Sequence, residues 1–179
     1  MTVPQGSVER VVLVDERDVE IGTEEKLAAH REGRLHRAFS VFVFDRNGRL
    51  LLQRRAAGKY HSAGLWSNTC CGHPRPGEAT PEAARRRLQE EMGFDCPLEP
   101  VFAFVYRAEL DHGLLEHELD QVFTGRFDGP PRPDPAEVSE WRPVHVAELS
   151  RDLAQNPDRY SVWLPQALDG LRERGAAPG

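Results

Sequence analysis

Apolar and polar residues in the first half of the chain are arranged as expected for strands joined by turns. Residues 8–15 alternate weakly, and residues 38–45 (AFSVFVFD) form an apolar run, so both segments are predicted to be strands. Asn47-Gly48 is a favoured hairpin dipeptide, and residues 50–54 form the expected return strand. We expect a turn over residues 15–22 and an irregular basic segment over residues 55–66.

Two segments carry helix signals. A short helix is expected to begin with Thr23 as its N-cap and to stop at Gly33. A second helix is expected with Thr80 as N-cap, Pro81 as first helical residue and Gly93 just past its end. The predicted core face of this second helix consists of three residues at helical spacing: Ala84, Leu88 and Met92.

The second half of the chain mixes strands and helices without strict alternation. Strands are expected at 101–109, 121–127 and 138–144, a polar loop at 110–120, and helices at 147–154 and 162–174. This order predicts an α+β or α/β fold with a mixed β-sheet and helices on both faces. We expect one domain over residues 1–179, with 1–7 and 175–179 loose.

Composition narrows the function classes. The chain has 179 residues, enough for one domain with a full core. A net charge of −6 gives no electrostatic reason to expect a nucleic-acid partner, and no apolar run reaches the length of a membrane span. No secretory signal is seen, and three cysteines do not form a disulfide framework, so we expect a cytoplasmic protein.

A long motif surrounds the second predicted helix. It has the form G-x5-E-x7-R-x-U-x-E-E-x-G-U, where U is bulky and apolar, and it runs from Gly72 to Phe94. Its adjacent carboxylates, Glu90 and Glu91, fall in the last helical turn, where the helix dipole disfavours anions, so they are expected to take a cation. An ordinary surface helix would explain a lone carboxylate pair but not the whole motif.

Histidines and glutamates at separated positions suggest a metal site. His73 follows the motif's first glycine, His30 and His36 lie near the N-terminus, and Glu116 and Glu118 lie in the predicted 110–120 loop. Three imidazoles and two carboxylates suit zinc, manganese or iron, and a bidentate carboxylate would complete an octahedron. If Glu118 enters the following strand, we expect the two glutamates to point to opposite sides of the extended backbone, and they could still converge on one ion if the loop curls.

Other polar residues have two interpretations. A single histidine is more often structural than a ligand, and the other four are interpreted as ordinary: His61, His112, His117 and His145. Four cations are either solvated or aimed at an anionic group, for which Arg offers a fork of donors and Lys a point charge: Lys26, Arg55, Lys59 and Arg87.

The motif resembles the Nudix box, and the pieces together resemble type I isopentenyl-diphosphate isomerases within the Nudix superfamily. One position departs from the hydrolase box, because Arg87 stands where the hydrolases have Glu. The resemblance spans about Thr23 to Trp163 and is carried by these segments: TEEKLAAH (23–30), RLHRAFS (34–40), RRAAGK (54–59), WSNTCCGHP (66–74), YRAEL (106–110), EHELD (116–120) and SVW (161–163).

The resemblance implies interconversion of isopentenyl and dimethylallyl diphosphate, a step in isoprenoid biosynthesis. It implies Mn²⁺ or Zn²⁺ at His30, His36, His73, Glu116 and Glu118, and Mg²⁺ at Glu91, arriving with the diphosphate. It implies Cys71 and Glu118 as the catalytic groups, with Tyr106 supporting the acid. The implied substrate contacts are Lys26, Arg55, Lys59 and Arg87 for the diphosphate and Trp163 for the hydrocarbon.

Such a reaction passes through a tertiary carbocation and needs one proton donor and one proton acceptor on opposite sides of the alkene. We expect Cys71, at a glycine-containing turn, to be a partly ionised thiol that acts as the opposing base. Trp163 could stabilise the cation, whereas Trp66 is expected to pack in the core and Cys70 to be a small buried hydrophobe.

Two alternatives remain open from the residues alone. One is a Nudix hydrolase of a nucleoside or other diphosphate, which Arg87 and the extra Cys, His and Glu residues disfavour. The other is a non-catalytic domain that binds a phosphorylated ligand or RNA, and the acidic net charge disfavours RNA. The expected partner is therefore a small prenyl diphosphate, with no nucleic acid and no membrane, and the protein is expected to be a monomer.

Overall fold

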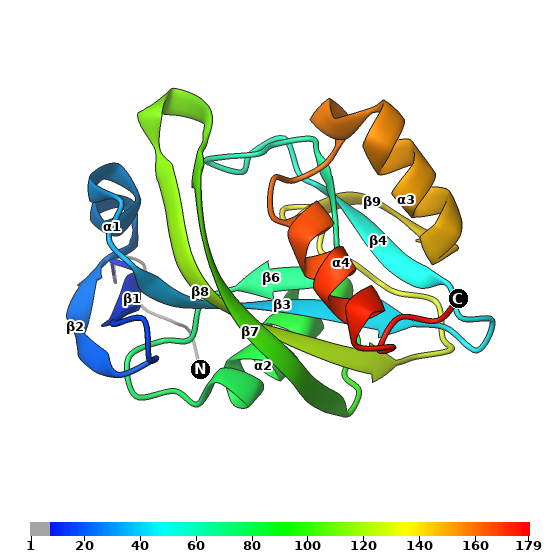
Figure 1. Ribbon diagram of the computed structural model, residues 1–179, viewed down its shortest axis with the longest axis horizontal. Coiled ribbons are helices and arrows are strands. Elements are labelled where there is room, and N and C mark those ends of the chain that lie inside the picture. Colours follow the sequence, from blue (N-terminus) through cyan, green and yellow to red (C-terminus); the bar gives the residue numbers. More distant parts are fainter. Residues whose placement is uncertain (1–7) are drawn as a thin grey trace.

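One long strand, β3 (His36–Phe44), organises the sheet in the computed structural model, which describes residues 8–179 (Figure 1). It pairs with four other strands, β1, β4, β6 and β8, and only β8 runs parallel to it. The expected looseness of residues 1–7 concerns a segment outside the described residues. The nine strands of residues 8–179 belong to one sheet, and the prediction that this sheet is mixed is confirmed.

The strands vary in length from two to twelve residues. Besides β3, they are β1 Arg10–Val14, β2 Glu20–Glu25, β4 Leu50–Arg55, β5 Trp66–Ser67, β6 Cys70–Gly72, β7 Leu98–Glu109, β8 Leu115–Arg126 and β9 Val138–Val144. The four α-helices of residues 8–179 are α1 Lys26–Glu32, α2 Thr80–Met92, α3 Val146–Gln155 and α4 Leu164–Glu173. Two short 3₁₀ turns cover Asp111–Gly113 and Pro157–Arg159.

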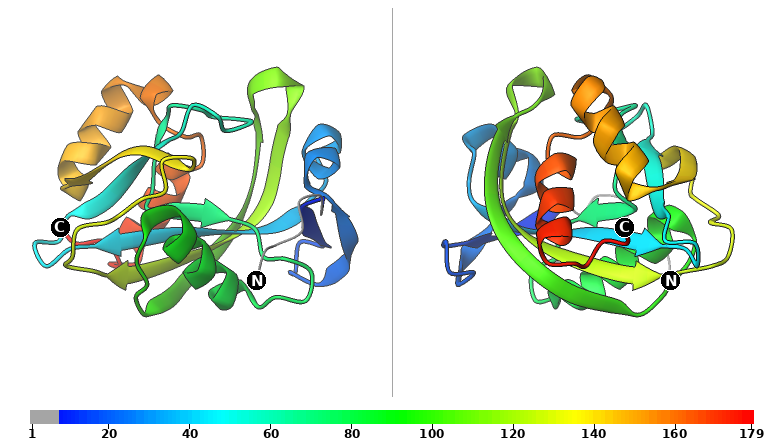
Figure 2. Two further views of the ribbon diagram at one scale, coloured as in Figure 1. Left: turned by 180° about the vertical axis from the view of Figure 1, so that it is seen from behind. Right: turned by 45° about the vertical axis from the view of Figure 1, so that its right-hand side comes forward.

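Helices cover both faces of the sheet, as predicted. In Figure 1 α4 lies in front of β3, and in the reverse view of Figure 2 α2 lies in front. Successive β3 side chains alternate between two core clusters, because side chains on a strand point alternately to its two faces. Phe42 joins the cluster formed with α3 and α4, and Val41 joins the cluster formed with α2.

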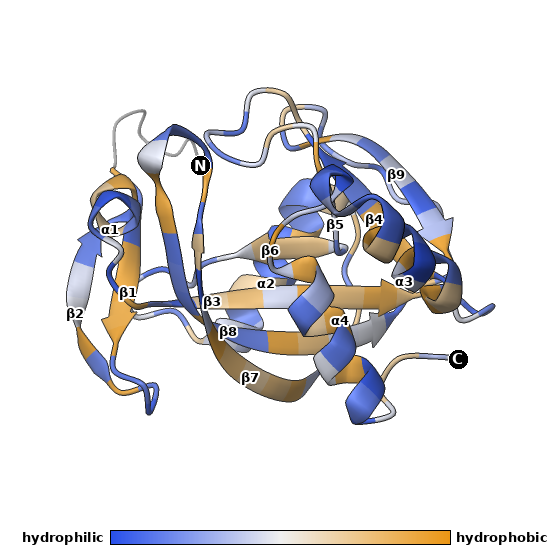
Figure 3. Ribbon diagram, turned by 45° about the horizontal axis from the view of Figure 1, so that its top comes forward, coloured by the Kyte–Doolittle hydropathy of each residue, from blue (hydrophilic) through white to orange (hydrophobic). Residues whose placement is uncertain are grey.

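The apolar faces of the elements fit this arrangement. Figure 3 shows β3 as apolar over most of its length, as expected for a strand covered on both sides. Ala84, Leu88 and Met92 of α2 are fully buried, so the predicted core face is confirmed. Leu149 of α3 and Leu164 of α4 are fully buried in the opposite cluster.

Strand register brings residues from distant parts of the sequence together. In the parallel β3–β8 pair His36 lies opposite Glu118, and in the β3–β6 pair Ser40 lies opposite Cys71. Tyr106 of β7 also lies opposite Glu118. The central sheet therefore carries a thiol, an imidazole, a phenol and a carboxylate within a few residues of one another.

The prediction of a helix from Thr23 was wrong. Residues 20–25 form the edge strand β2, and Thr23 pairs with Val12 of β1. Arg10 also donates hydrogen bonds to the hydroxyl and the carbonyl of Thr23. This tertiary pairing outweighs the local helix signal, and α1 begins only at Lys26. The predicted end at Gly33 is confirmed, with a left-handed φ of 64°.

The α2 N-cap prediction was wrong by one residue. Ala79 is the N-cap, and Thr80 is already helical. The predicted end of α2 at Gly93 is confirmed, because Gly93 has a φ of 73° and its N–H donates to Gln89 O. A Cβ at Gly93 would lie 2.1 Å from the carbonyl oxygen of Arg132, so this position also requires glycine for close packing.

The prediction of a polar loop over residues 110–120 was wrong. β8 begins at Leu115, and the connection to β7 is a short turn that includes the 3₁₀ segment Asp111–Gly113. Pairing with β7 along residues 116–120, and with β3 from Glu118 onward, holds these polar residues in the sheet. Figure 2 shows β7 and β8 as a long curved hairpin that rises beyond the rest of the sheet.

The other boundaries differ little from the predictions. The 138–144 strand is confirmed as β9, while β7 starts three residues earlier than predicted and α4 two residues later. The short strands β5 and β6 were not predicted. Near the C-terminus, Ala176 and Ala177 pack against the cluster under α4. Among residues 8–179, the helices are too short or too polar to cross a bilayer.

Candidate active site

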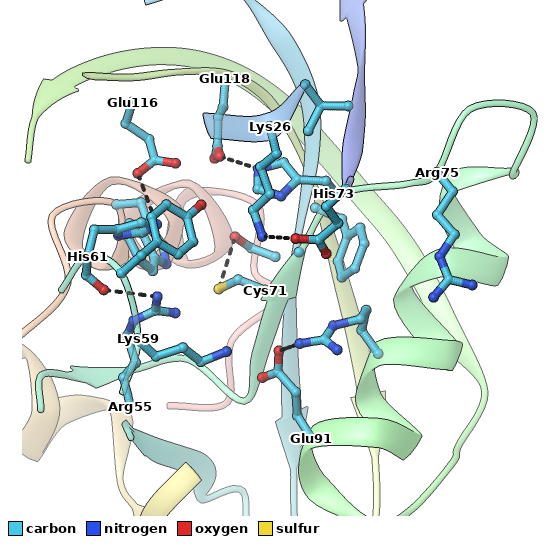
Figure 4. A pocket seen from close by; sticks show the side chains of 18 of the residues that line it. Lys26, Arg55, Lys59, His61, Cys71, His73, Arg75, Glu91, Glu116 and Glu118 are labelled. Atoms are coloured by element: carbon cyan, nitrogen blue, oxygen red, sulfur yellow. Dashed lines mark hydrogen bonds and ion pairs between the residues drawn. The ribbon is translucent and has the colours of Figure 1, made fainter. Parts of the chain in front are cut away.

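One cavity is lined by most of the predicted site residues (Figure 4). Side chains reach it from α1, β3, the segment after β4, β6, α2, β7, β8 and the start of α4. Its lining includes Cys71, Glu118 and Trp163 together with the cations Lys26, Arg55, Lys59 and Arg87. The fold therefore brings the predicted catalytic pair and the predicted diphosphate contacts to one cavity.

Five side chains form a cluster, and three of them, His73, Glu116 and Glu118, line this cavity. One ligand atom from each lies within 4.8 Å of all the others: His30, His36, His73, Glu116 and Glu118. They come from α1, β3, the loop after β6, and β8. These are the five residues named as metal ligands from the sequence, and four of them are buried, with His73 half-buried.

Hydrogen bonds set the orientation of two of the imidazoles. His30 Nδ1 lies 2.7 Å from the carbonyl oxygen of Lys26, and His36 Nδ1 lies 2.8 Å from that of Arg34. A carbonyl oxygen only accepts, so each Nδ1 carries the proton and each Nε2 presents a lone pair toward the cluster. This is the arrangement that outer hydrogen bonds impose on metal-binding histidines.

The donor atoms of this cluster are not fully satisfied by one another. Among residues 8–179, His36 Nε2 and Glu116 Oε2 are buried without a hydrogen-bond partner. His36 Nε2 lies 3.5 Å from Glu118 Oε1, an ion-pair distance rather than a hydrogen bond. Buried polar atoms are rarely left unpaired, so a bound cation is the natural partner. The residues therefore fit a divalent metal with mixed nitrogen and oxygen ligands.

The protonation states of the histidines and of Glu118 point the same way. Burial lowers the pKa of His73 to about 4, although Glu118 opposes this shift, and burial also lowers the pKa of His30. Burial and the neighbouring Glu118 raise the pKa of Glu116 well above its usual value. Burial opposes ionisation of Glu118 too, but its contacts with His36 and His73 hold its pKa well below the usual range. Neutral imidazoles and the ionised Glu118 are the forms that bind metal, whereas the raised pKa of Glu116 favours its protonated form and so opposes metal binding.

The expectation that Glu116 and Glu118 point to opposite sides was wrong. Residues two apart on a strand lie on the same face, and both glutamates belong to the regular strand β8. Glu116 Oε1 lies 3.2 Å from His30 Nε2, and Glu118 Oε1 lies 2.8 Å from His73 Nε2. No curled loop is needed for them to converge.

Glu118 is also held from the β7 side. The Tyr106 hydroxyl donates a 2.7 Å hydrogen bond to Glu118 Oε2. Burial and the neighbouring carboxylates raise the pKa of Tyr106 well above 10, so the phenol keeps its proton and acts as donor. Glu118 thus contacts the imidazoles through Oε1 and the phenol through Oε2.

Cys71 lies on the short strand β6, not at a turn as predicted. Its thiol donates to Asn68 Oδ1 at 3.1 Å and lies 3.9 Å from the Ser40 hydroxyl. Burial and the nearby Asp120 raise the pKa of Cys71 to about 12. The expectation of a partly ionised thiol was therefore wrong, because a buried site next to carboxylates disfavours the thiolate.

The four cations are engaged by carboxylates or by backbone carbonyls. Lys26 Nζ lies 2.8 Å from Glu9, and Lys59 forms an ion pair with Glu137. Arg55 donates to the carbonyl oxygen of His61 at 3.1 Å, and its guanidinium lies 5.6 Å from the ring centre of Trp163. Arg87 is paired with three carboxylates, those of Glu90, Glu91 and Glu137.

Glu91 is buried at the C-terminal end of α2, next to this cationic group. It accepts hydrogen bonds from Gln53 Nε2 at 2.8 Å and from Arg87 at 2.5 Å. The cation expected beside the carboxylate pair is thus Arg87, which bridges Glu90 and Glu91. Arg87 and Glu91 both line the cavity, so an incoming anion can reach Arg87 and a metal ion can reach Glu91.

The structure confirms that Trp66 packs in the core and that Cys70 is a small buried hydrophobe. Trp66 packs in the cluster under α3 and α4, with Arg142 lying 4.7 Å from its ring centre. Cys70 is fully buried in the α2 cluster.

Sequence reasoning missed three polar residues around the cavity. His61, interpreted as ordinary, is buried in the cavity wall 3.9 Å from Glu116 Oε2, and burial lowers its pKa to about 3. Asp120, on the same face of β8 as Glu116 and Glu118, accepts a 2.7 Å hydrogen bond from Ser40. Its spacing would have been a signal if strand β8 had been predicted over those residues. The third is Asn68, which is fully buried.

Comparison with known proteins places this geometry in a family. The NUDIX domain model matches residues 34–164. An Isopentenyl-diphosphate Delta-isomerase of Burkholderia multivorans is 60% identical over 155 residues, covering 87% of this chain and 88% of that protein. Isopentenyl-diphosphate Delta-isomerase 1 of Aromatoleum aromaticum is 58% identical over 161 residues, covering 90% and 91%.

Solved structures agree on the fold. The crystal structure of DR0079 from Deinococcus radiodurans has a TM-score of 0.76 at 22% identity and covers 90% of this chain and 98% of that one. The MutT protein from Methanosarcina mazei Go1 has a TM-score of 0.61 at 20% identity and covers 78% and 94%. These low identities show a shared fold only.

Proposed function

The chain belongs to the NUDIX domain family and, within it, to the isopentenyl-diphosphate Delta-isomerases, and from this premise we propose that it interconverts isopentenyl diphosphate and dimethylallyl diphosphate. The observation that carries the proposal is a cavity lined by Cys71, by three members of the His/Glu cluster and by four cations. Such a cavity offers groups that can give a proton to an alkene or take one from it, and it offers positive charge that can bind a diphosphate.

The proposed metal ligands are His30, His36, His73, Glu116 and Glu118, and the unpaired His36 Nε2 and Glu116 Oε2 support this assignment within residues 8–179. The preferred ions are Mn²⁺ and Zn²⁺, since both accept imidazole and carboxylate ligands. The ion, when bound, supplies fixed positive charge beside Glu118.

Cys71 and Glu118 are proposed to move the two protons. One proton is added to the terminal methylene carbon of isopentenyl diphosphate, which leaves a tertiary carbocation, and one proton is removed from the allylic carbon. Glu118 has the support such a role needs, because Tyr106 and His73 hold its two oxygens at 2.7 and 2.8 Å. Cys71 enters the reaction as a thiol, in agreement with its raised pKa.

The diphosphate is proposed to bind among Lys26, Arg55, Lys59 and Arg87. Carboxylates form ion pairs with three of these cations, and the substrate's phosphate oxygens would take over those contacts. Glu91, at the same end of the cavity, is proposed to bind Mg²⁺ that arrives with the diphosphate.

The hydrocarbon end is proposed to face Trp163. Trp163 is buried, lines the cavity and is oriented by a hydrogen bond from its indole N–H to Asn68. An aromatic ring beside a developing carbocation stabilises it through the negative potential of the ring face.

Diphosphate hydrolysis is the less favoured alternative. Arg87 stands at a box position that is Glu in the hydrolases, and its ion pairs occupy Glu90 and Glu91. Four of the five proposed metal ligands lie outside the box and have no evident use in hydrolysis: His30, His36, Glu116 and Glu118. The substrate is accordingly proposed to be a small prenyl diphosphate. We also propose that residues 1–179 form one monomeric domain and that the protein acts in the cytoplasm.

The test incubates the purified full chain with isopentenyl diphosphate, Mn²⁺ and Mg²⁺, and measures acid-labile allylic product and inorganic phosphate in parallel. Isomerisation predicts acid-labile product without phosphate release. Unchanged starting material, or phosphate release without isomer, would refute the proposal.

A further inference from the structure

Asn68 connects two residues that are proposed to act on the hydrocarbon, Cys71 and Trp163. Its Oδ1 accepts three hydrogen bonds, from the Trp163 indole N–H at 3.0 Å, the Cys71 thiol at 3.1 Å and the Ser67 hydroxyl at 3.0 Å. Cys71 lies on β6, and Trp163 is the N-cap of α4, 95 positions from Asn68 in the sequence. The amide oxygen of Asn68 therefore links β6 to the start of α4, two elements that are far apart in the sequence.

The orientation of this amide is unambiguous. Its Nδ2 donates to the carbonyl oxygens of Val41 at 3.1 Å and of Cys70 at 2.9 Å. Carbonyl oxygens only accept hydrogen bonds, and an indole N–H only donates them. In the flipped amide, Oδ1 would face two carbonyl oxygens and Nδ2 would face the indole N–H, so these hydrogen bonds would be lost. Asn68 is fully buried, which makes each of these hydrogen bonds costly to lose.

Asn68 does not line the cavity, although Cys71 and Trp163 both do. It therefore acts on the reaction only through its neighbours. Ser67 adds a further connection, because its hydroxyl lies 2.9 Å from that of Ser161, two residues before Trp163. The contacts of Asn68 are separate from those that hold the metal ligands and from those that hold the diphosphate cations.

From this geometry we propose that Asn68 is a positioning residue that fixes the direction of the Cys71 thiol and the plane of the Trp163 indole relative to each other. The inference rests on the proposed function, in which both groups act on the hydrocarbon. Misplacing a reacting group by about 1 Å can cost about 100-fold in rate. Loss of Asn68 should therefore lower kcat and leave diphosphate recognition, and hence KM, nearly unchanged.

Thr69 provides a matched control. It is also fully buried, and its hydroxyl accepts from Val43 N–H at 2.9 Å and donates to Leu51 O at 2.7 Å. It contacts neither Cys71 nor Trp163 through these hydrogen bonds. Thr69→Val thus removes comparable buried hydrogen bonds from the next residue without touching either reacting group.

The experiment compares Asn68→Leu, Asn68→Ala and Thr69→Val with the natural protein, all as full chains loaded with Mn²⁺ and assayed with isopentenyl diphosphate and Mg²⁺. We expect kcat to fall about 100-fold in both Asn68 variants, with KM within about threefold, and kcat to change less than about threefold in Thr69→Val. Asn68→Ala serves if Asn68→Leu does not fold, because water can enter the smaller side chain's site.

Two further readouts separate positioning from general destabilisation. In the proteins loaded with diamagnetic Zn²⁺ in place of Mn²⁺, the Trp163 indole N–H resonance, assigned with Trp163→Phe, should move upfield and exchange faster in the Asn68 variants but not in Thr69→Val. The kcat losses of Asn68→Ala and Trp163→Phe should be less than additive in the double variant, because both remove one shared contact.

Three results would overturn the inference: kcat losses no larger than that of Thr69→Val, a rise in KM with kcat unchanged, or fully additive losses in the double variant. A natural protein that shows no isomerisation at all would instead refute the proposed function, and it would be recognised before any variant is compared.

Discussion

Replacing Tyr106 by Phe removes one hydroxyl from the centre of the site and nothing else. The hydroxyl donates at 2.7 Å to Glu118 Oε2, and Tyr106 is buried. Phe keeps the ring, which stacks on Phe104 with 5.5 Å between ring centres. The change therefore isolates the contribution of a single hydrogen bond to the proposed catalytic carboxylate.

The size of the effect follows from the nature of that bond. A hydrogen bond to a charged group contributes about 1.5–3 kcal/mol, and each 1.4 kcal/mol corresponds to about tenfold in rate. We expect kcat to fall about 10–150-fold. KM should change little, because the hydroxyl is part of the Glu118 contacts and not of the cationic group. The assay is the initial rate of dimethylallyl diphosphate formation across substrate concentrations.

Tyr60→Phe is the matched control. Tyr60 also lines the cavity and is largely buried, but among residues 8–179 its hydroxyl has no hydrogen-bond partner. Removing an unpartnered buried hydroxyl should change kcat by less than about threefold. The reasoning is refuted if Tyr106→Phe loses less than about threefold in kcat, or if Tyr60→Phe loses as much.

Three further predictions concern the metal, the thiol and the cations. Mn²⁺ at about 100 times its Kd should stabilise the protein by about 2.7 kcal/mol. Calorimetry should then show a melting temperature about 5–10 °C above that of the protein treated with a chelator, and an unchanged melting temperature would contradict the metal site. Cys71→Ala should abolish isomerisation while binding Mn²⁺ and the diphosphate with affinities within about threefold of the natural protein, as measured by titration calorimetry; residual activity above a few per cent would exclude an essential thiol. Lys59→Met, which also leaves Glu137 with Arg87 as its remaining cationic partner, should raise KM for isopentenyl diphosphate about 10–150-fold with a smaller change in kcat, and an unchanged KM would remove Lys59 from the diphosphate site.

Local sequence signals predicted the elements that depend on local physics. Gly33 and Gly93 end their helices in the left-handed conformation, as their residue type indicated. Helical spacing identified the buried face of α2 because that face packs along one side of the sheet. The strand at β9 was also predicted from its local pattern.

The errors occurred where distant pairing decides the structure. β2 and the first half of β8 are polar and lack a strand pattern, and they are strands because β1, β3 and β7 pair with them. Because β8 was not predicted over these residues, the sequence did not show that Glu116, Glu118 and Asp120 share one face of a strand. Without the strand, spacing could not show that these carboxylates point the same way.

The candidate site was predicted largely through the family resemblance, not through spacing. His30, His36 and His73 are separated by tens of residues at most, yet only the fold brings their ring nitrogens within 4.8 Å. Asn68 and His61 were missed because a buried asparagine or histidine in an irregular segment has no periodic signal. Their contacts join residues that are far apart in the sequence or lie on different strands.

The most direct test of the central claim follows the reaction by proton NMR in D₂O, with the Mn²⁺ replaced by diamagnetic Zn²⁺ and Mg²⁺ added with isopentenyl diphosphate. Because protons reach the alkene from side chains that exchange with solvent, the account predicts dimethylallyl diphosphate that carries deuterium in a methyl group, and no such product with Cys71→Ala. Intact isopentenyl diphosphate without deuterium after long incubation of the natural protein with either metal would contradict it, as would release of phosphate in place of the allylic isomer.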